Sequence, residues 1–78
     1  MLAPYLVRFT DHAARRAGRR GIGLAAVEAT VVDLHDRRRK NPGGAAEWRV
    51  EGGGIVVLYD WPTGDDHGVA LVRSVWRR

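Results

Sequence analysis

One histidine and four arginines lie close together in the stretch 9–22, which reads FTDHAARRAGRRGI. The histidine is His12, and the arginines follow it at positions 15, 16, 19 and 20. Histidine side chains exchange protons near neutral pH, and the planar guanidinium of arginine binds phosphate or carboxylate through paired hydrogen bonds. These side chains can together hold an anion and move a proton beside it, so we treat them as the candidate chemical site.

A short helix must position these side chains. Thr10 or Asp11 can cap its N-terminus by accepting a hydrogen bond from a free backbone N–H of the first turn. The spacings of three and four residues put the four arginines on two adjacent sides of the helix. Gly21 can end the helix in the left-handed region, with Ile22 folding back as an apolar contact. We therefore expect a helix over residues 11–20.

Arginine dominates the charge of the chain. The 78 residues carry a formal net charge of +4, and 12 of the 13 basic residues are arginine. Basic residues concentrate at 15–20, 37–40 and 73–78, and acids dominate 51–66. A genomic codon bias explains the preference for arginine over lysine equally well, but it does not explain this clustering. We therefore expect the partner to be a polyanion or an acidic protein. The length of the chain predicts a single domain that spans residues 1–78.

Several classes of protein are disfavoured. The chain has no cysteine, which excludes disulfides and thiolate metal sites. It contains no apolar run long enough for a membrane span and no typical secretory signal, so we expect a cytoplasmic location and no membrane partner. Asp65, Asp66 and His67 share one turn with no distant ligand, so we expect no metal site and no cofactor.

Hydrophobic periodicity predicts the remaining elements. We expect a strand over 5–10, a helix from residue 24 to about 35, and strands over 45–51, 55–61 and 69–76. The core-facing stripe of the second helix is expected to be Leu24, Val27, Val31 and Leu34. In the last strand, Arg73 is expected to share a face with Leu71 and Val75. The charged run 36–40 is expected to be loop.

This order of elements predicts an α+β fold of topology β-α-α-β-β-β. Two helices would pack on one face of a small antiparallel twisted sheet, with strand 55–61 at its centre because it is the most apolar. The other face would be left to solvent or a ligand, lined by strand residues such as Arg49 and Arg73.

The stretch 9–22 also carries a resemblance. Phe9, Thr10, His12 and Ala13, then Arg16, then the run Arg20 to Ile22, resemble the F-T-x-H-A…R…R-G-I signature of a small bacterial and phage family related to RelE/ParE and BrnT toxins. The resemblance implies a RelE-like fold and a metal-independent ribonuclease that often serves as the toxin of a toxin–antitoxin pair. It matches His12, Arg16 and Arg20 by motif, and Arg49, Arg73 and Trp76 by location on the sheet.

Metal-free RNA cleavage needs a base for the ribose 2′-OH, cations for the phosphorane and an acid for the leaving 5′-oxygen. We assign His12 as the base or acid, with Arg16, Arg20, Arg49 and Arg73 as the remaining catalytic candidates. Contacts to nucleic acid are expected from a second set: Arg15, Arg19, Arg38, Arg39, Lys40, Trp76 and Arg78. The implied partners are RNA, free or on the ribosome, and an acidic antitoxin.

Structural explanations compete with each assignment. His12 can simply cap or pack the helix start, Arg16 and Arg20 can pair with Glu28 or Asp33, and the tryptophans can be packing residues. The whole chain can also be a non-catalytic module that binds an acidic protein or nucleic acid through its arginines. A helix-turn-helix regulator is disfavoured, because the second helix offers no side chains suited to base edges.

Overall fold

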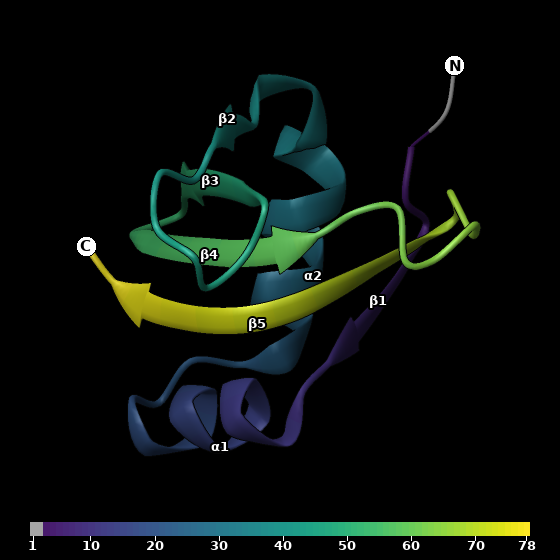
Figure 1. Ribbon diagram of the computed structural model, residues 1–78. Coiled ribbons are helices and arrows are strands. Elements are labelled where there is room, and N and C mark those ends of the chain that lie inside the picture. Colours follow the sequence, from purple (N-terminus) through teal and green to yellow (C-terminus); the bar gives the residue numbers. More distant parts are fainter. Residues whose placement is uncertain (1–2) are drawn as a thin grey trace.

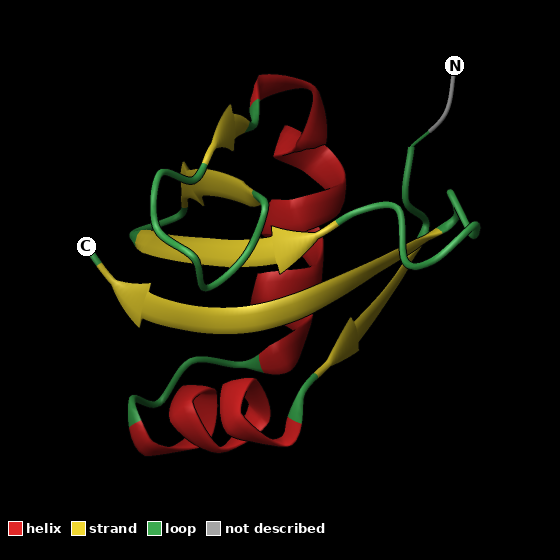
Figure 2. Ribbon diagram, in the orientation of Figure 1, coloured by secondary structure: helices red, strands yellow, loops and turns green. Residues whose placement is uncertain are grey.

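The computed structural model describes residues 3–78 as two helices packed on a five-stranded sheet (Figures 1 and 2). The predicted α+β class is therefore confirmed. In chain order the elements are β1 (Leu6–Phe9), α1 (Asp11–Arg19), α2 (Leu24–Leu34), a 3₁₀ turn (His35–Arg37), β2 (Arg39–Lys40), β3 (Trp48–Gly52), β4 (Ile55–Asp60) and β5 (Val69–Arg77).

The sheet has the strand order β1-β5-β4-β3-β2, so β4 lies at its centre as predicted. The sheet is mixed rather than wholly antiparallel, because β1 runs parallel to β5 while the other pairs are antiparallel. The chain passes through both helices and the meander before β5 returns beside β1. Only residues 69–72 of β5 pair with β1, and α1 packs beside β5 (Figure 1).

The charged run 36–40 is not simply a loop. It forms the 3₁₀ turn and the short edge strand β2, in which Arg39 pairs with Arg49 of β3. A two-residue strand is too short to produce a periodic pattern, so periodicity could not predict it. β3 begins at Trp48 rather than residue 45, because residues 41–47 form a loop held by the bond from Asn41 Nδ2 to the Ala46 carbonyl (3.0 Å).

A β-bulge in the pairing of β4 with β5 changes which side chains of β5 point to each face of the sheet. Leu58 pairs with Ser74 and the next residue, Tyr59, pairs with Val72, so Arg73 is the extra residue. Val75 is consequently buried in the core while Arg73 is exposed, and the predicted sharing of one face by these two residues is wrong. A bulge shifts the alternation of side chains by one position, which periodicity alone cannot detect.

The core lies between α2 and the sheet. Val27 and Val31 of α2 are fully buried with Val57 and Tyr59 of β4, and Leu34 packs against this cluster. Leu24 was predicted to belong to the same stripe, but its side chain is 43% exposed. It is the first residue of the helix.

The predicted ends of α1 are confirmed. Thr10 caps the N-terminus, since its Oγ1 accepts a bond from the backbone N–H of Ala13 (3.1 Å). Gly21 has φ 66°, and the Ile22 N–H bonds to the Ala17 carbonyl at 2.8 Å. The left-handed conformation at position 21 therefore ends the helix and buries the Ile22 side chain, as expected from the sequence.

Arg77 at the end of β5 ties the C-terminus of α1 to the sheet. Its Nε donates to the Arg20 carbonyl (3.2 Å) and its second guanidinium nitrogen donates to the Gly21 carbonyl (3.0 Å). The last carbonyls of a helix lack intrahelical partners and carry partial negative charge, so a cation is favoured there. Sequence patterns do not single out Arg77 for this role, because only the fold brings it beside residue 21.

A buried polar cluster supports the end of the sheet under β2. His35 is only 2% exposed, and its Nδ1 lies 2.8 Å from the Tyr59 hydroxyl. Arg38 stacks over Trp48 and Trp61, with its guanidinium carbon 4.2 and 4.9 Å from the ring centroids. Burial lowers the pKa of His35, and the charge of Arg38 lowers it further against the opposing effect of Asp36.

The lowered pKa of His35 predicts a pH-dependent stability. Below the unfolded-state value near 6.5 the unfolded chain binds a proton that folded His35 resists, so stability falls as pH decreases through that value. The variant His35→Gln cannot titrate but can still bond to Tyr59. We expect the difference in unfolding free energy between pH 7.5 and pH 5 to be smaller in this variant, measured by urea denaturation. An equal difference in both proteins would contradict the assignment.

The contacts of Arg77 predict that Arg77→Ala loosens α1. We expect the free energy of unfolding to fall by about 1 kcal/mol, because the two hydrogen bonds are exposed and water replaces them in part. Amide hydrogen exchange should accelerate within α1 more than within α2. Arg8→Ala, which removes an exposed arginine from β1, is the matched control and should change neither quantity.

Candidate functional site

Three of the predicted catalytic residues surround one hollow at the start of α1. His12 and Arg16 of α1, with Arg73 from the β5 bulge, line it together with Thr10, Ala45 and Ser74. The bulge is what turns Arg73 toward this side, and the position of α1 beside β5 is what brings His12 near it. A base and two guanidinium groups are thus gathered within one shallow depression.

The hollow is partly prearranged by hydrogen bonds and an ion pair. Arg16 donates to the Ser74 hydroxyl at 3.3 Å, which fixes its guanidinium against the sheet. Arg73 lies 3.6 Å from the Asp60 carboxylate, and both side chains are more than one third exposed. Exposed pairs of this kind are worth little and exchange readily, so an incoming phosphate can compete for Arg73. His12 is exposed and makes no hydrogen bond within residues 3–78 through its side chain.

The other arginines of the α1 region, Arg15, Arg19 and Arg20, do not line this hollow. Arg19 and Arg20, with Arg16, line a second small depression on the helix, and Arg15 is exposed. The structure therefore separates Arg20 from the His12 hollow while leaving it adjacent to Arg16. The alternative in which Arg16 and Arg20 pair with Glu28 or Asp33 is not found among the described residues.

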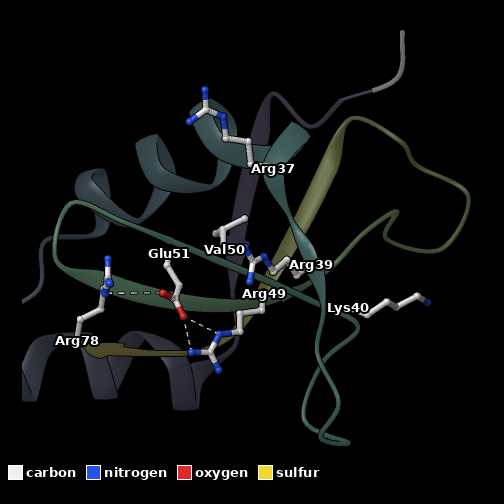
Figure 3. Close-up of a pocket in the computed structure, with 7 residues that line it drawn as sticks. All are labelled: Arg37, Arg39, Lys40, Arg49, Val50, Glu51 and Arg78. Carbon is white, nitrogen blue, oxygen red and sulfur yellow. Dashed lines mark hydrogen bonds and ion pairs between the residues drawn. The ribbon is translucent and has the colours of Figure 1, made fainter.

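Arg49 belongs to a second basic cluster, which surrounds Glu51 (Figure 3). Arg49 Nε bonds to Glu51 Oε1 at 3.0 Å, and Arg78 Nε lies 3.7 Å from Oε2. The lining residues are Arg37, Arg39, Lys40, Arg49, Val50, Glu51 and Arg78. In Figure 3 Arg49 and Arg78 point toward Glu51, whereas Arg37 and Lys40 point away. The cluster has five cations and one carboxylate, so it favours anions.

Glu51 responds to this surplus of positive charge. The hydrogen bond from Arg49 lowers the pKa of the Glu51 carboxyl, and the charges of Arg49, Arg78 and Arg39 lower it further. The carboxylate therefore stays ionised and holds two guanidinium groups that would otherwise repel each other. An ionised Glu51 thus organises the cluster without neutralising it.

Strand register connects the two clusters. Arg39 pairs with Arg49, Arg49 with Leu58, and Leu58 with Ser74, which accepts the bond from Arg16. These residues form one row across the sheet, which we call the transverse row. Neighbouring strands are about 4.8 Å apart, so Arg49 lies roughly 10 Å from Ser74 along this row.

The aromatic residues divide between the two sides of the sheet. Trp76 is half-buried, and Arg49 lies above its ring with the guanidinium carbon 5.8 Å from the centroid. Trp48 and Trp61 instead pack against the core and hold Arg38, while Lys40 Nζ lies 4.9 Å from the Trp48 centroid. The structure thus gives Arg38 and Lys40 contacts with tryptophan rings rather than a place in the transverse row.

Neither a metal-binding cluster nor a membrane-spanning helix occurs within residues 3–78. No group of three or more histidine, aspartate or glutamate side chains converges there as a metal-binding set. No helix in this part of the chain has the length and apolar character that crossing a membrane requires.

Comparison with known proteins places the fold. No protein-family model and no curated protein matches the chain, so the signature described above remains a prediction. Among solved structures, the chain is similar to a chain in the crystal structure of the toxin–antitoxin complex RelBE2 from Mycobacterium tuberculosis. The TM-score is 0.71 at 25% sequence identity, over 100% of this chain and 95% of that chain. The order of elements and this similarity together establish a RelE-like fold.

Proposed function

We propose that the chain is a RelE-like toxin that cleaves RNA without a metal ion and is neutralised by an antitoxin protein. The observation that carries the proposal is the gathering of His12, Arg16 and Arg73 around one hollow on a RelE-like fold. The similar chain belongs to a toxin–antitoxin complex, which supports a protein partner. The proposed site of action is the cytoplasm, where RNA and an antitoxin meet.

In the proposed reaction His12 removes the proton from a ribose 2′-OH, and the resulting oxygen attacks the adjacent phosphorus. Arg16 and Arg73 donate hydrogen bonds to the non-bridging phosphate oxygens, which gain negative charge in the phosphorane. The bond to the 5′-oxygen breaks, and that oxygen takes a proton from the protonated histidine or from water. The products are a 2′,3′-cyclic phosphate and a 5′-hydroxyl.

The transverse row supplies the binding surface for the rest of the RNA. Arg49 and Arg39 lie farther along it, and their guanidinium groups can bind other phosphates of the same strand. Trp76 beside Arg49 offers an apolar face on which a base can stack. Arg15, Arg19, Arg20 and Arg78 add positive charge around this surface and increase the rate of encounter with RNA.

Replacing the proposed base tests catalysis directly. On induction in a bacterial host, the wild-type chain should stop growth and fragment RNA, and His12→Ala should do neither. Because His12 is exposed, the variant should keep its circular dichroism spectrum and melting temperature. His67→Ala, which removes another exposed histidine outside the hollow, is the matched control and should behave as wild type. Growth arrest with intact RNA would overturn the ribonuclease proposal.

A non-catalytic binding module is the second candidate. The cluster around Glu51 favours it, because five cations there bind an anion whether or not His12 is present. Under this alternative His12→Ala changes neither growth nor binding, and the arginines alone carry the function.

Charge reversal separates electrostatic binding from catalysis. Arg15→Glu should weaken binding of a fluorescent single-stranded RNA, and the slope of log K against log salt should become shallower by about 0.7 for each phosphate that the variant no longer neutralises. Anisotropy would be measured in the His12→Ala background to prevent cleavage. Arg8→Glu carries the same change of charge on β1 and should have a smaller effect. Equal effects of both reversals would show that net charge, not the α1 surface, controls binding.

A further inference from the structure

An apolar groove runs between β1 and α2, separate from the basic surfaces. Its lining comes from the N-terminal strand region and from one side of the helix: Tyr5, Leu6, Val7, Ala25, Glu28, Ala29, Val32 and Asp33. Its volume is about 330 Å³. None of these residues belongs to the proposed catalytic hollow or to the Glu51 cluster.

The groove gathers most of the exposed large hydrophobic residues of the described chain. Tyr5 is 80% exposed, Leu6 43% and Val32 42%, and only Leu24 lies outside the lining. Ala25 and Ala29 present small side chains, which allow another chain to approach α2 closely. Exposed apolar residues gathered in this way are characteristic of a protein-binding surface rather than of ordinary solvated surface.

The groove also borders an unpaired strand edge. β1 is the first strand of the sheet, and within the described residues only one of its edges is paired, with β5. Exposed edge strands present free backbone N–H and C=O groups that readily pair with another chain. A segment lying in the groove can therefore bury apolar side chains and gain backbone hydrogen bonds together.

The charge of the groove is opposite to that of the chain as a whole. Glu28 and Asp33 are exposed in its lining, and neither forms an ion pair within residues 3–78. The groove lining contains no basic residue, although the net charge is +4. Electrostatic complementarity therefore favours a basic occupant at this place and an acidic one at the arginine surfaces.

We propose that this groove binds a segment of a partner protein in which apolar side chains alternate with lysine or arginine. A second copy of this chain is the competing occupant, because its edge strand β1 carries Arg8 among apolar residues, and the dimerisation measurement below tests it. Identifying the partner as the antitoxin rests on the proposed function above. The antitoxin would then bring a basic, apolar segment to the groove as well as acidic residues to the arginine surfaces.

The probe for this proposal is a displayed library of random 12-residue peptides, selected against the folded His12→Ala protein. Enriched peptides should combine apolar residues with lysine or arginine. A synthetic copy should bind at least tenfold more weakly to Val32→Glu, which places a charge in the groove. Leu24→Glu, on the same helix with similar exposure but outside the lining, is the matched control and should bind as the parent does.

A second pair of variants tests the sign of the charge. Glu28→Lys with Asp33→Lys should reverse the selection toward acidic peptides, whereas Glu47→Lys with Asp65→Lys should not. Enrichment of acidic peptides by the parent, or equal binding to Val32→Glu, would overturn the proposal. Concentration-dependent dimerisation abolished by Val32→Glu would replace it with self-association. Peptide binding does not depend on RNA cleavage. If the His12→Ala experiment contradicts the ribonuclease proposal, the peptide-binding result still tests the groove.

Discussion

The structure depends on β5 having different neighbours along its length. Its first residues pair in parallel with β1, and its later residues lie beside α1. The bulge at Arg73 adjusts the strand between these two environments and keeps Val72 and Val75 both in the core. Arg77 then bonds to the carbonyls that end α1. The position of His12 and Arg16 relative to Arg73 follows from these contacts, because α1 contributes only small side chains, Ala13 and Ala17, to the core.

The arginines of the sheet are stabilised by contacts with carboxylates and with tryptophan rings. Two carboxylates, Glu51 and Asp60, lie among the arginines of the sheet and pair with them, and both carboxylate side chains remain more than one third exposed. Arg38 instead stacks on two tryptophan rings, where the ring faces attract its cation and cover its apolar plane. The sheet therefore keeps a surplus of positive charge, which favours binding of a phosphate chain.

Two surfaces of opposite character lie on one small domain. The transverse row and α1 are basic, whereas the groove between β1 and α2 is apolar with an acidic rim. A single partner that contacts both surfaces needs one acidic and one basic segment. This requirement distinguishes the correct partner from other charged proteins better than charge attraction alone does. In the proposed function, the antitoxin uses the groove as well as the arginine surface, whereas RNA uses the arginine surface alone.

The sequence determined those features that depend on neighbouring residues. A cap at Thr10 or Asp11, the left-handed Gly21, the buried Ile22 and the central position of β4 all follow from local chemistry and hydrophobic period. The structure agrees with each and selects Thr10 as the cap. The tertiary structure alone decided what depends on contacts between distant segments. Four features could not be predicted from hydrophobic periodicity: the parallel pairing of β5 with β1, the strand at Arg39, the bulge at Arg73 and the contacts of Arg77. Each is determined by the element that packs against it. The same reason explains why residue types and spacing indicated His12, Arg16 and Arg73 as candidates, but only the fold brings Arg73 beside the two α1 residues and places Arg49 in another cluster.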